Sequence, residues 1–102
     1  MKILSTGHRY LLDNFEAKNK LGQALQFIEK EKDASGNFVT VRDGTTNDEV
    51  ILAVLNRLEY LDRKLPAPEN SHAISFLRLA LYWLRKRTEN RLARGVEGTP
   101  KP

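Results

Sequence analysis

The fold is decided by the stretch TTNDEVILAVLNRLEYLDRKLPAPENSHAISFLRLALYWLRKRTENRLAR, residues 45–94. Thr46 and Glu49 stand three residues apart, the spacing of a capping box, in which each side chain satisfies a free N–H group at a helix start. Behind them apolar residues recur every three or four positions, the period of one helical face. These residues are Val50, Ile51, Val54, Leu55, Leu58 and Leu61. The spacing predicts a helix over Asn47–Lys64.

The connection Leu65-Pro66-Ala67-Pro68-Glu69 ends this helix, because each proline lacks an N–H group and biases the preceding residue away from helical geometry. A second helix is predicted over Asn70–Arg94, with Asn70 or Ser71 as its N-cap. Four of its apolar side chains are expected to point inward: Ile74, Leu77, Leu81 and Leu84. Because a short connection makes two helices antiparallel neighbours, the pair should form a helical hairpin.

The second helix is apolar on more than one face. Between Ile74 and Leu84 only Ser75 and Arg78 interrupt the apolar residues. This run is well short of the roughly 20 residues that a membrane span needs. One partner helix covers only one stripe of it, and an uncovered apolar patch of this kind is typical of an interface. We therefore expect further copies of the chain, or its N-terminal residues, to cover the rest.

Length and composition indicate one domain, residues 1–102, with a β-rich layer at 1–44, the helical hairpin at 45–94 and a mobile tail at 95–102. The chain has no cysteine, which excludes disulfides, thiolate metal sites and cysteine nucleophiles. The segment Met1–Gly7 lacks an apolar core long enough for a signal peptide. These features favour a cytoplasmic protein.

The first 44 residues predict short strands. His8–Leu12 is one candidate strand, and Asn37–Arg42 is another because its residues are β-branched and aromatic. Glu16–Lys32 fits a helical face, but Ala24–Lys30 also fits a strand facing Asn37–Arg42. Asp33–Asn37 has turn chemistry, and a lone strand has no partner, so the hairpin is favoured over the helix. The predicted fold class is α+β, a small N-terminal antiparallel sheet followed by two antiparallel helices.

Positive charge is concentrated at the end of the chain. Residues 1–70 contain 10 Lys or Arg and 11 Asp or Glu, whereas residues 71–102 contain 7 and 2. Most of the excess lies on the last turns of the second helix, at Arg85, Lys86, Arg87, Arg91 and Arg94. One interpretation is a solvated face that complements the negative end of the helix dipole. The other is an anion site, because arginine binds phosphate bidentately.

Catalytic motifs are scarce. The two histidines, His8 and His72, form no pair at metal-ligand spacing, and the isolated glycines form no phosphate loop. Ser71 and His72 are sequence neighbours that point to different faces of a helix, so they do not form a nucleophile pair. We therefore predict a binding protein rather than an enzyme, with no cofactor and no metal.

Four segments together resemble a known family: Asp43–Val50, Pro66–Asn70, Trp83–Thr88 and Arg94–Thr99. They are similar to the helical-hairpin family of small bacteriophage proteins that includes the Thoeris anti-defence and anti-CBASS "sponges". The resemblance covers roughly residues 24–99, and the N-terminal strands look closer to the Thoeris branch. It implies a symmetric homo-oligomer, a dimer or a hexamer, in the cytoplasm of an infected bacterium.

The resemblance also implies a ligand and a site. Members sequester signalling nucleotides made by host immune enzymes without cleaving them: cyclic ADP-ribose isomers in the Thoeris branch, cyclic di- or trinucleotides in the other. Tyr60 matches an aromatic residue that stacks on a base, Asn70 an asparagine after the proline turn, and Arg87 an arginine beyond the helix-two Trp. Arg42 is a weaker match. Simpler alternatives are a rim position for Tyr60, an N-cap for Asn70 and a dipole partner for Arg87.

The sequence departs from this family at four positions. Leu65 and Pro68 replace an aromatic and a basic residue, which changes part of the expected pocket. Phe76 and Leu79 replace charged residues, which bears on the oligomer. Two other functions remain open, a structural assembly protein and a nucleic-acid-binding protein that uses the basic helix end. Against nucleic acid, no aromatic residues are interleaved with the basic cluster and the net charge is only +4.

Overall fold

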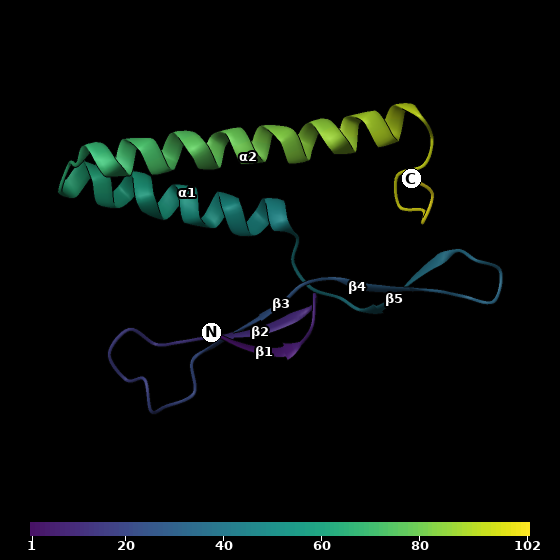
Figure 1. Cartoon of the computed structure of the whole chain (residues 1–102), viewed down its shortest axis with the longest axis horizontal. Coiled ribbons are helices and arrows are strands. Elements are labelled where there is room, and N and C mark those ends of the chain that lie inside the picture. The colour runs from purple at the N-terminus through teal and green to yellow at the C-terminus, as the bar shows by residue number, and fades with distance from the viewer. The chain divides into compact units, whose positions relative to one another are not determined.

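The computed structural model describes residues 1–102, which form two compact units, Met1–Thr46 and Asn47–Pro102 (Figure 1). The first unit contains only strands and the second only helices, so the predicted α+β class is confirmed. The unit boundary lies two residues beyond the predicted end of the β-rich layer. The strands are β1 (Lys2–Ser5), β2 (Arg9–Leu12), β3 (Gln23–Gln26), β4 (Glu29–Lys32) and β5 (Phe38–Arg42).

Strands β1, β2 and β3 form an antiparallel sheet in that order. In the turn between β1 and β2, His8 N donates to Ser5 O at 3.0 Å. The same turn includes Gly7, whose φ is 82°. A positive φ is tolerated there because glycine has no Cβ. On the other side, Tyr10 of β2 stands opposite Leu25 of β3. Strand β2 confirms the predicted strand at His8–Leu12, whereas β1 was not expected.

Strands β4 and β5 form a separate two-stranded antiparallel sheet. Its turn is the predicted one: the Asp33 Oδ1 atom accepts from the backbone N–H groups of Ser35 and Asn37, each at 2.9 Å. Such local side-chain-to-backbone bonds are the reason that Asp favours turns. A hairpin on this turn is thereby confirmed, although its first strand is Glu29–Lys32 rather than Ala24–Lys30, and the helical alternative for Glu16–Lys32 is wrong.

The predicted single strand Ala24–Lys30 is also wrong, because it divides between the two sheets. Its first half belongs to β3 and its second half to β4, and the chain between them bonds to Thr45 instead. Ile28 N donates to Thr45 O, and Thr45 N donates to Gln26 O, both at 2.9 Å. Thr45 can come this close to Gln26 only because residue 44 is a glycine, since a Cβ atom on Gly44 would lie 2.5 Å from the Gln26 oxygen.

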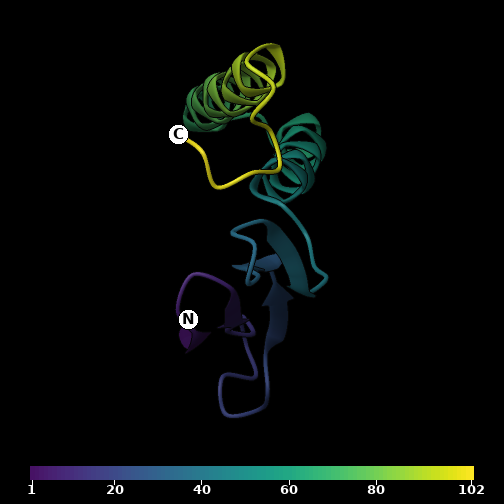
Figure 2. The ribbon, with the colours of Figure 1, turned by 90° about the vertical axis from the view of Figure 1, so that its right-hand side faces the viewer.

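The second unit is an antiparallel hairpin of α1 (Asn47–Lys64) and α2 (Pro68–Ala93), which lie side by side, with the C-terminal part of the longer α2 extending beyond α1 (Figures 1 and 2). The core is formed by Leu55, Ile74 and Leu81, with Ile51, Leu58 and Leu77 packed against it. The bounds of α1 and the inward side of α2 are as predicted. Neither helix combines the length and the apolar character needed to cross a membrane.

The start of α2 differs from the prediction. The helix begins at Pro68 with Ala67 as N-cap, so Asn70 and Ser71 lie inside its first turn rather than capping it. Proline suits this position because the first N–H groups of a helix have no partner within the helix. The connection is closed by Asp62 Oδ1, which accepts from Ala67 N at 3.1 Å and from Asn70 Nδ2 at 3.3 Å.

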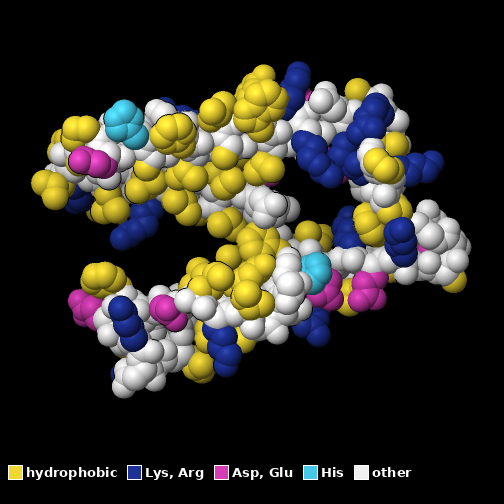
Figure 3. Space-filling view, viewed as in Figure 1, with side chains coloured by type: hydrophobic (Ala, Val, Ile, Leu, Met, Phe, Trp, Pro, Cys, Tyr) yellow, Lys and Arg dark blue, Asp and Glu magenta, His cyan; other side chains and the backbone are white.

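The side of α2 away from the core exposes large apolar side chains. Phe76 is 71% exposed, Trp83 61% and Leu79 52%. Figure 3 shows hydrophobic side chains gathered along the helical hairpin. Within this unit, therefore, α1 covers only one side of the apolar run, as the sequence predicts, and a continuous apolar face is left over.

Candidate functional site

The C-terminal half of α2 carries a hollow of about 370 Å³. It is lined by Trp83, Lys86, Arg87, Asn90, Arg91, Arg94 and Pro102. We call this site the Trp83 hollow. Its lining combines one aromatic ring, one amide and four cationic side chains, and it includes no Asp, Glu or His. This composition suits an anionic ligand that has a flat ring.

The helical repeat places these residues together. Trp83, Arg87, Asn90 and Arg94 follow one another at spacings of four, three and four, so they form one row along the same side of the helix. The row extends about 16 Å along the helix axis at about 1.5 Å per residue. A ligand lying along it would therefore meet the indole ring first and the cations beyond it.

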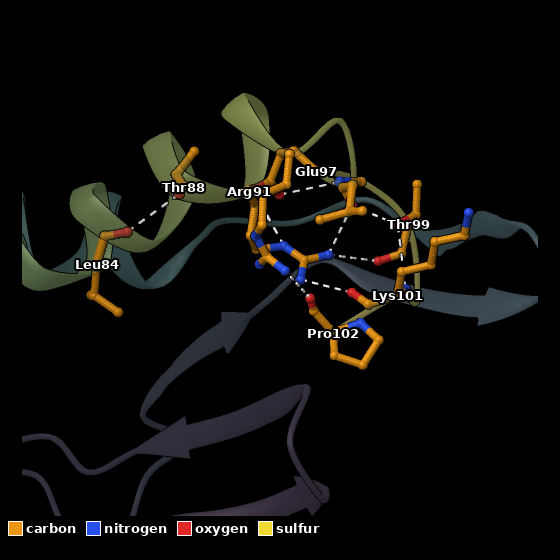
Figure 4. A network of polar contacts seen from close by, with 10 residues as sticks. Leu84, Thr88, Arg91, Glu97, Thr99, Lys101 and Pro102 are labelled. Carbon is orange, nitrogen blue, oxygen red and sulfur yellow. Dashed lines mark hydrogen bonds and ion pairs between the residues drawn. The ribbon is translucent and has the colours of Figure 1, made fainter.

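One of the four cations is committed to the protein itself (Figure 4). The Arg91 side chain is only 8% exposed and its Nε lies 3.6 Å from Glu97 Oε2. Arg91 Nη1 donates to Lys101 O at 2.8 Å, and Nη2 donates to Val96 O and Thr99 O, both at 2.9 Å. We call these contacts the Arg91 clasp. The clasp folds residues 96–102 back against the end of α2.

The Arg91 clasp corrects one expectation from the sequence. Arg91 belongs neither to a solvated face nor to a free anion site, because its guanidinium is buried and bonded to main-chain oxygens. The structure also gives the segment 95–102 defined contacts, although the sequence predicts a mobile tail. Main-chain oxygens are supplied by any residue type, so no sequence pattern could have indicated this role.

The other three cations of the Trp83 hollow remain available. Arg87 makes no ion pair and no hydrogen bond, and Arg94 Nη1 donates only to the main-chain oxygen of Pro102, at 2.7 Å. Lys86 Nζ lies 3.8 Å from Glu89 Oε2, an exposed pair. Exposed pairs contribute little and exchange readily with a better partner. The hollow therefore presents three cations to a ligand.

The position of Arg87 does not suit a dipole partner. The helix ends at Ala93, and the attraction between a cation and the helix dipole falls off within the last turn. Arg87 lies six residues before that end. The helix dipole therefore does not explain an arginine at this position. Its place among the cations that line the Trp83 hollow favours a role in binding an anion.

Two of the residues implied by the family resemblance lie at the opposite end of the hairpin. Tyr60 is 47% exposed, and Lys64 Nζ lies 5.0 Å from the centre of its ring, a cation–π contact. Asn70 is partly buried and donates to Asp62. From the first turn of α2, Asn70 thus helps to close the connection between the helices, but it is not an N-cap.

A single hairpin does not bring the implied residues together. Seventeen residues of α2 separate Asn70 from Arg87, about 25 Å at about 1.5 Å per residue. Arg42 is the exposed last residue of β5 in the other unit, in register with Glu29. The structure groups Arg87 with Trp83, Lys86 and Arg94 instead. Sequence reasoning includes Lys86 and Arg94 in the candidate anion site but misses Trp83, although the spacing of the row indicates it.

Comparison with known proteins gives one informative match. No model of a known protein family matches the chain. The chain is 39% identical over 80 residues to a protein of Bacillus phage SBSphiJ7 named Thoeris anti-defense 1, and the match covers 67% of this chain. It covers 56% of that phage protein, so the chain spans little more than half of its length. The resemblance found in the sequence is therefore confirmed, and the chain is a relative of the Thoeris anti-defence branch.

Proposed function

We propose that the protein is a phage anti-defence protein that binds a host immune signalling nucleotide and holds it without cleaving it, in the cytoplasm of the infected cell. The observation that carries the proposal is the Trp83 hollow in a relative of Thoeris anti-defense 1. An aromatic ring stacks on a nucleobase, and arginines bind phosphates through charge-assisted hydrogen bonds. The hollow offers both kinds of group.

The ligand proposed first is a cyclic ADP-ribose isomer, because the relationship is to the Thoeris branch. Such a molecule carries one base and two linked phosphates. The hollow offers one indole ring for the base and three available cations for the two phosphates: Lys86, Arg87 and Arg94. Cyclic di- or trinucleotides are the second class.

We further propose that the complete site is shared between chains of a symmetric oligomer, a dimer or a hexamer. Asn70 lies about 25 Å along α2 from Arg87, further than a small ligand reaches, and Tyr60 lies near the same end of the hairpin on α1. Two-fold symmetry would place the end of one chain's α2 against the connection of its neighbour. The exposed Phe76 and Leu79 offer the apolar area for such an assembly. At these two positions the family resemblance predicts charged residues, so the contact would differ from that of the relatives.

Holding rather than cleaving is supported by the groups that line the Trp83 hollow. General acid–base catalysis near neutral pH uses a histidine, a carboxylate or a lysine, tyrosine or cysteine of suitably shifted pKa. The lining consists of arginines, one exposed lysine, an amide, an indole and a proline. These groups neutralise and orient phosphate.

Binding and the fate of the ligand can be measured together. We expect isothermal titration with a cyclic ADP-ribose isomer to give saturable binding, and chromatography after denaturation to recover the ligand intact. Arg87→Ala should weaken binding about tenfold or more, because charge-assisted phosphate bonds are lost. Arg57→Ala is the matched control, since Arg57 is exposed on α1 and makes no ion pair. Turnover above one product per site would contradict the non-enzymatic part of the proposal.

The shared site has its own test. Tyr60→Ala should weaken binding by losing stacking, on the order of 1–3 kcal/mol in single-strand binders. A mixed oligomer of Tyr60→Ala and Arg87→Ala chains should recover intact sites, since some interfaces then combine a normal Tyr60 with a normal Arg87. If both variants bind like the unmodified protein, the site is not shared and neither residue contacts the ligand.

Nucleic-acid binding is the alternative that the same experiments separate. The Arg91 clasp removes one cation from the basic helix end, which weakens the case for a phosphate-backbone surface. A ligand that binds only the folded state raises the unfolding midpoint. We expect a cyclic ADP-ribose isomer to raise it and short duplex DNA to leave it unchanged at physiological salt. A shift with DNA alone would favour the nucleic-acid function.

A further inference from the structure

We infer that one chain by itself forms a base-and-pyrophosphate subsite at the end of α2, in which Trp83 stacks on the base and Lys86 and Arg94 join Arg87 on the phosphates. This inference rests on the proposed function and deepens it, because it assigns ligand contacts to three residues that neither the family resemblance nor the relative's name identifies. The subsite would be present before any second chain contributes Tyr60.

The indole ring is placed for stacking. Trp83 lies one helical turn before Arg87 in the same row and is 61% exposed. Its ring contacts the ring of Tyr82 edge-on, with the centroids 5.2 Å apart and the planes at 75°. Such a contact restricts the rotation of the indole without enclosing it. A nucleobase stacks on an exposed aromatic ring whatever its identity, since every base has a π-face.

The cations are placed for two phosphates. Arg87 and Lys86 follow the indole within one turn, and Arg94 lies about two turns further along the row. Arg94 has one hydrogen-bond partner, the main-chain oxygen of Pro102. This contact is exposed, and exposed contacts of this kind exchange readily with another partner. Arg94 would therefore exchange its contact with Pro102 for a phosphate when the ligand binds.

The Arg91 clasp supplies the wall of the subsite. Its three hydrogen bonds to main-chain oxygens hold residues 96–102 against the helix and bring Pro102 to the edge of the Trp83 hollow. The cation that makes the clasp is buried and thus unavailable to a ligand. Arg91 is a positioning residue in this arrangement, and Lys86, Arg87 and Arg94 are the ligand contacts.

Fluorescence provides a direct test, because Trp83 is the only tryptophan of the chain. The probes are ADP, inorganic pyrophosphate and adenosine. We expect ADP to quench the Trp83 emission at saturation, and pyrophosphate to bind by titration calorimetry with little change in emission. Adenosine should bind more weakly than ADP because it lacks phosphates. Raising the salt concentration should weaken ADP and pyrophosphate binding and leave adenosine nearly unaffected.

Substitutions test which side chains contact the base and which contact the phosphates. Trp83→Leu should weaken ADP binding about fivefold or more, the loss typical of one stacked base, and Trp83→Phe should restore part of it. Lys86→Ala and Arg94→Ala should each weaken the binding of ADP and of pyrophosphate about fivefold. The affinity for adenosine should be unchanged. Arg57→Ala should alter none of the three affinities.

The outcomes separate this inference from the proposed function. ADP binding by calorimetry without a change in Trp83 emission would overturn the stacking role. So would an emission change that follows protein dilution rather than ADP, because a second copy would then cover the ring. If a cyclic ADP-ribose isomer binds and Trp83→Leu has no effect, the subsite is wrong and the function stands. If ADP quenches Trp83 and no signalling nucleotide binds, the function is wrong and the subsite stands.

Discussion

An Arg91→Ala substitution should release residues 96–102 from the end of α2 and leave the helical hairpin folded. The Arg91 side chain is 8% exposed and donates three hydrogen bonds. Bonds to a charged group contribute about 1.5–3 kcal/mol each, on the order of 5–9 kcal/mol in total. Ordering the backbone of these seven residues costs about 1–2 kcal/mol per residue, a sum that is no smaller. We therefore expect the segment to open once the guanidinium is removed.

Two measurements follow from this balance. The backbone N–H groups of Val96 and Thr99 bond to Arg91 O and Val96 O, at 3.0 and 3.1 Å, so their hydrogen exchange reports whether the segment is closed. We expect both to exchange at least about tenfold faster in the variant, an opening of about 1.4 kcal/mol. The free energy of unfolding in urea should fall by only about 1–2 kcal/mol, because the core is untouched.

The matched control is Arg94→Ala, which removes one exposed contact to Pro102 and leaves the Arg91 clasp in place. Arg91→Lys keeps the charge but cannot reach three carbonyl oxygens with a planar fork, so it should behave more like the alanine variant. Unchanged exchange at Val96 and Thr99 in Arg91→Ala would refute the reasoning, since the clasp would then not hold the segment.

Three further predictions concern packing. Leu55→Ala should lower the free energy of unfolding in urea by about 2–5 kcal/mol, because Leu55 is a core residue, whereas the exposed Val54→Ala should cost less. Leu79→Glu should shift the light-scattering mass toward the monomer if Leu79 lies between chains, and an unchanged mass would remove it from the interface. Gly44→Ala should loosen the strand unit, seen as lost dispersion in its NMR spectrum, because its Cβ would lie 2.5 Å from Gln26 O.

The helical hairpin could be predicted well because its signals are local. A three- and four-residue apolar period and two prolines lie within the sequence of the elements themselves, and they gave the bounds of α1. The sequence predicts the start of α2 two residues too late, because Asn70 resembles an N-cap while Pro68 fits the first helical position equally well. Both residues fit a helix start, and only the backbone geometry shows that the helix begins at Pro68.

The strands were predicted less well because their partners are set by contacts distant in sequence. Ala24–Lys30 has the composition of one strand, but a bridge between Phe27 and Thr45 separates its two halves, which pair in different sheets. The site shows the same limit. Arg87 was identified through the family resemblance, and its row with Trp83 and Arg94 follows from helical spacing. The burial of Arg91 could not be foreseen, because its partners are main-chain atoms.

The connection between the helices has a kinetic consequence. Asp62 accepts hydrogen bonds from both Ala67 and Asn70, so the segment that carries Asn70 is fixed before any ligand arrives. A protein that intercepts a messenger competes with the messenger's receptor for time as well as for affinity. Under the proposed function this end would need little ordering when the ligand arrives, and Lys86, Arg87 and Arg94 would attract an anionic ligand and speed its association. The fixed connection would then favour fast capture as well as tight binding.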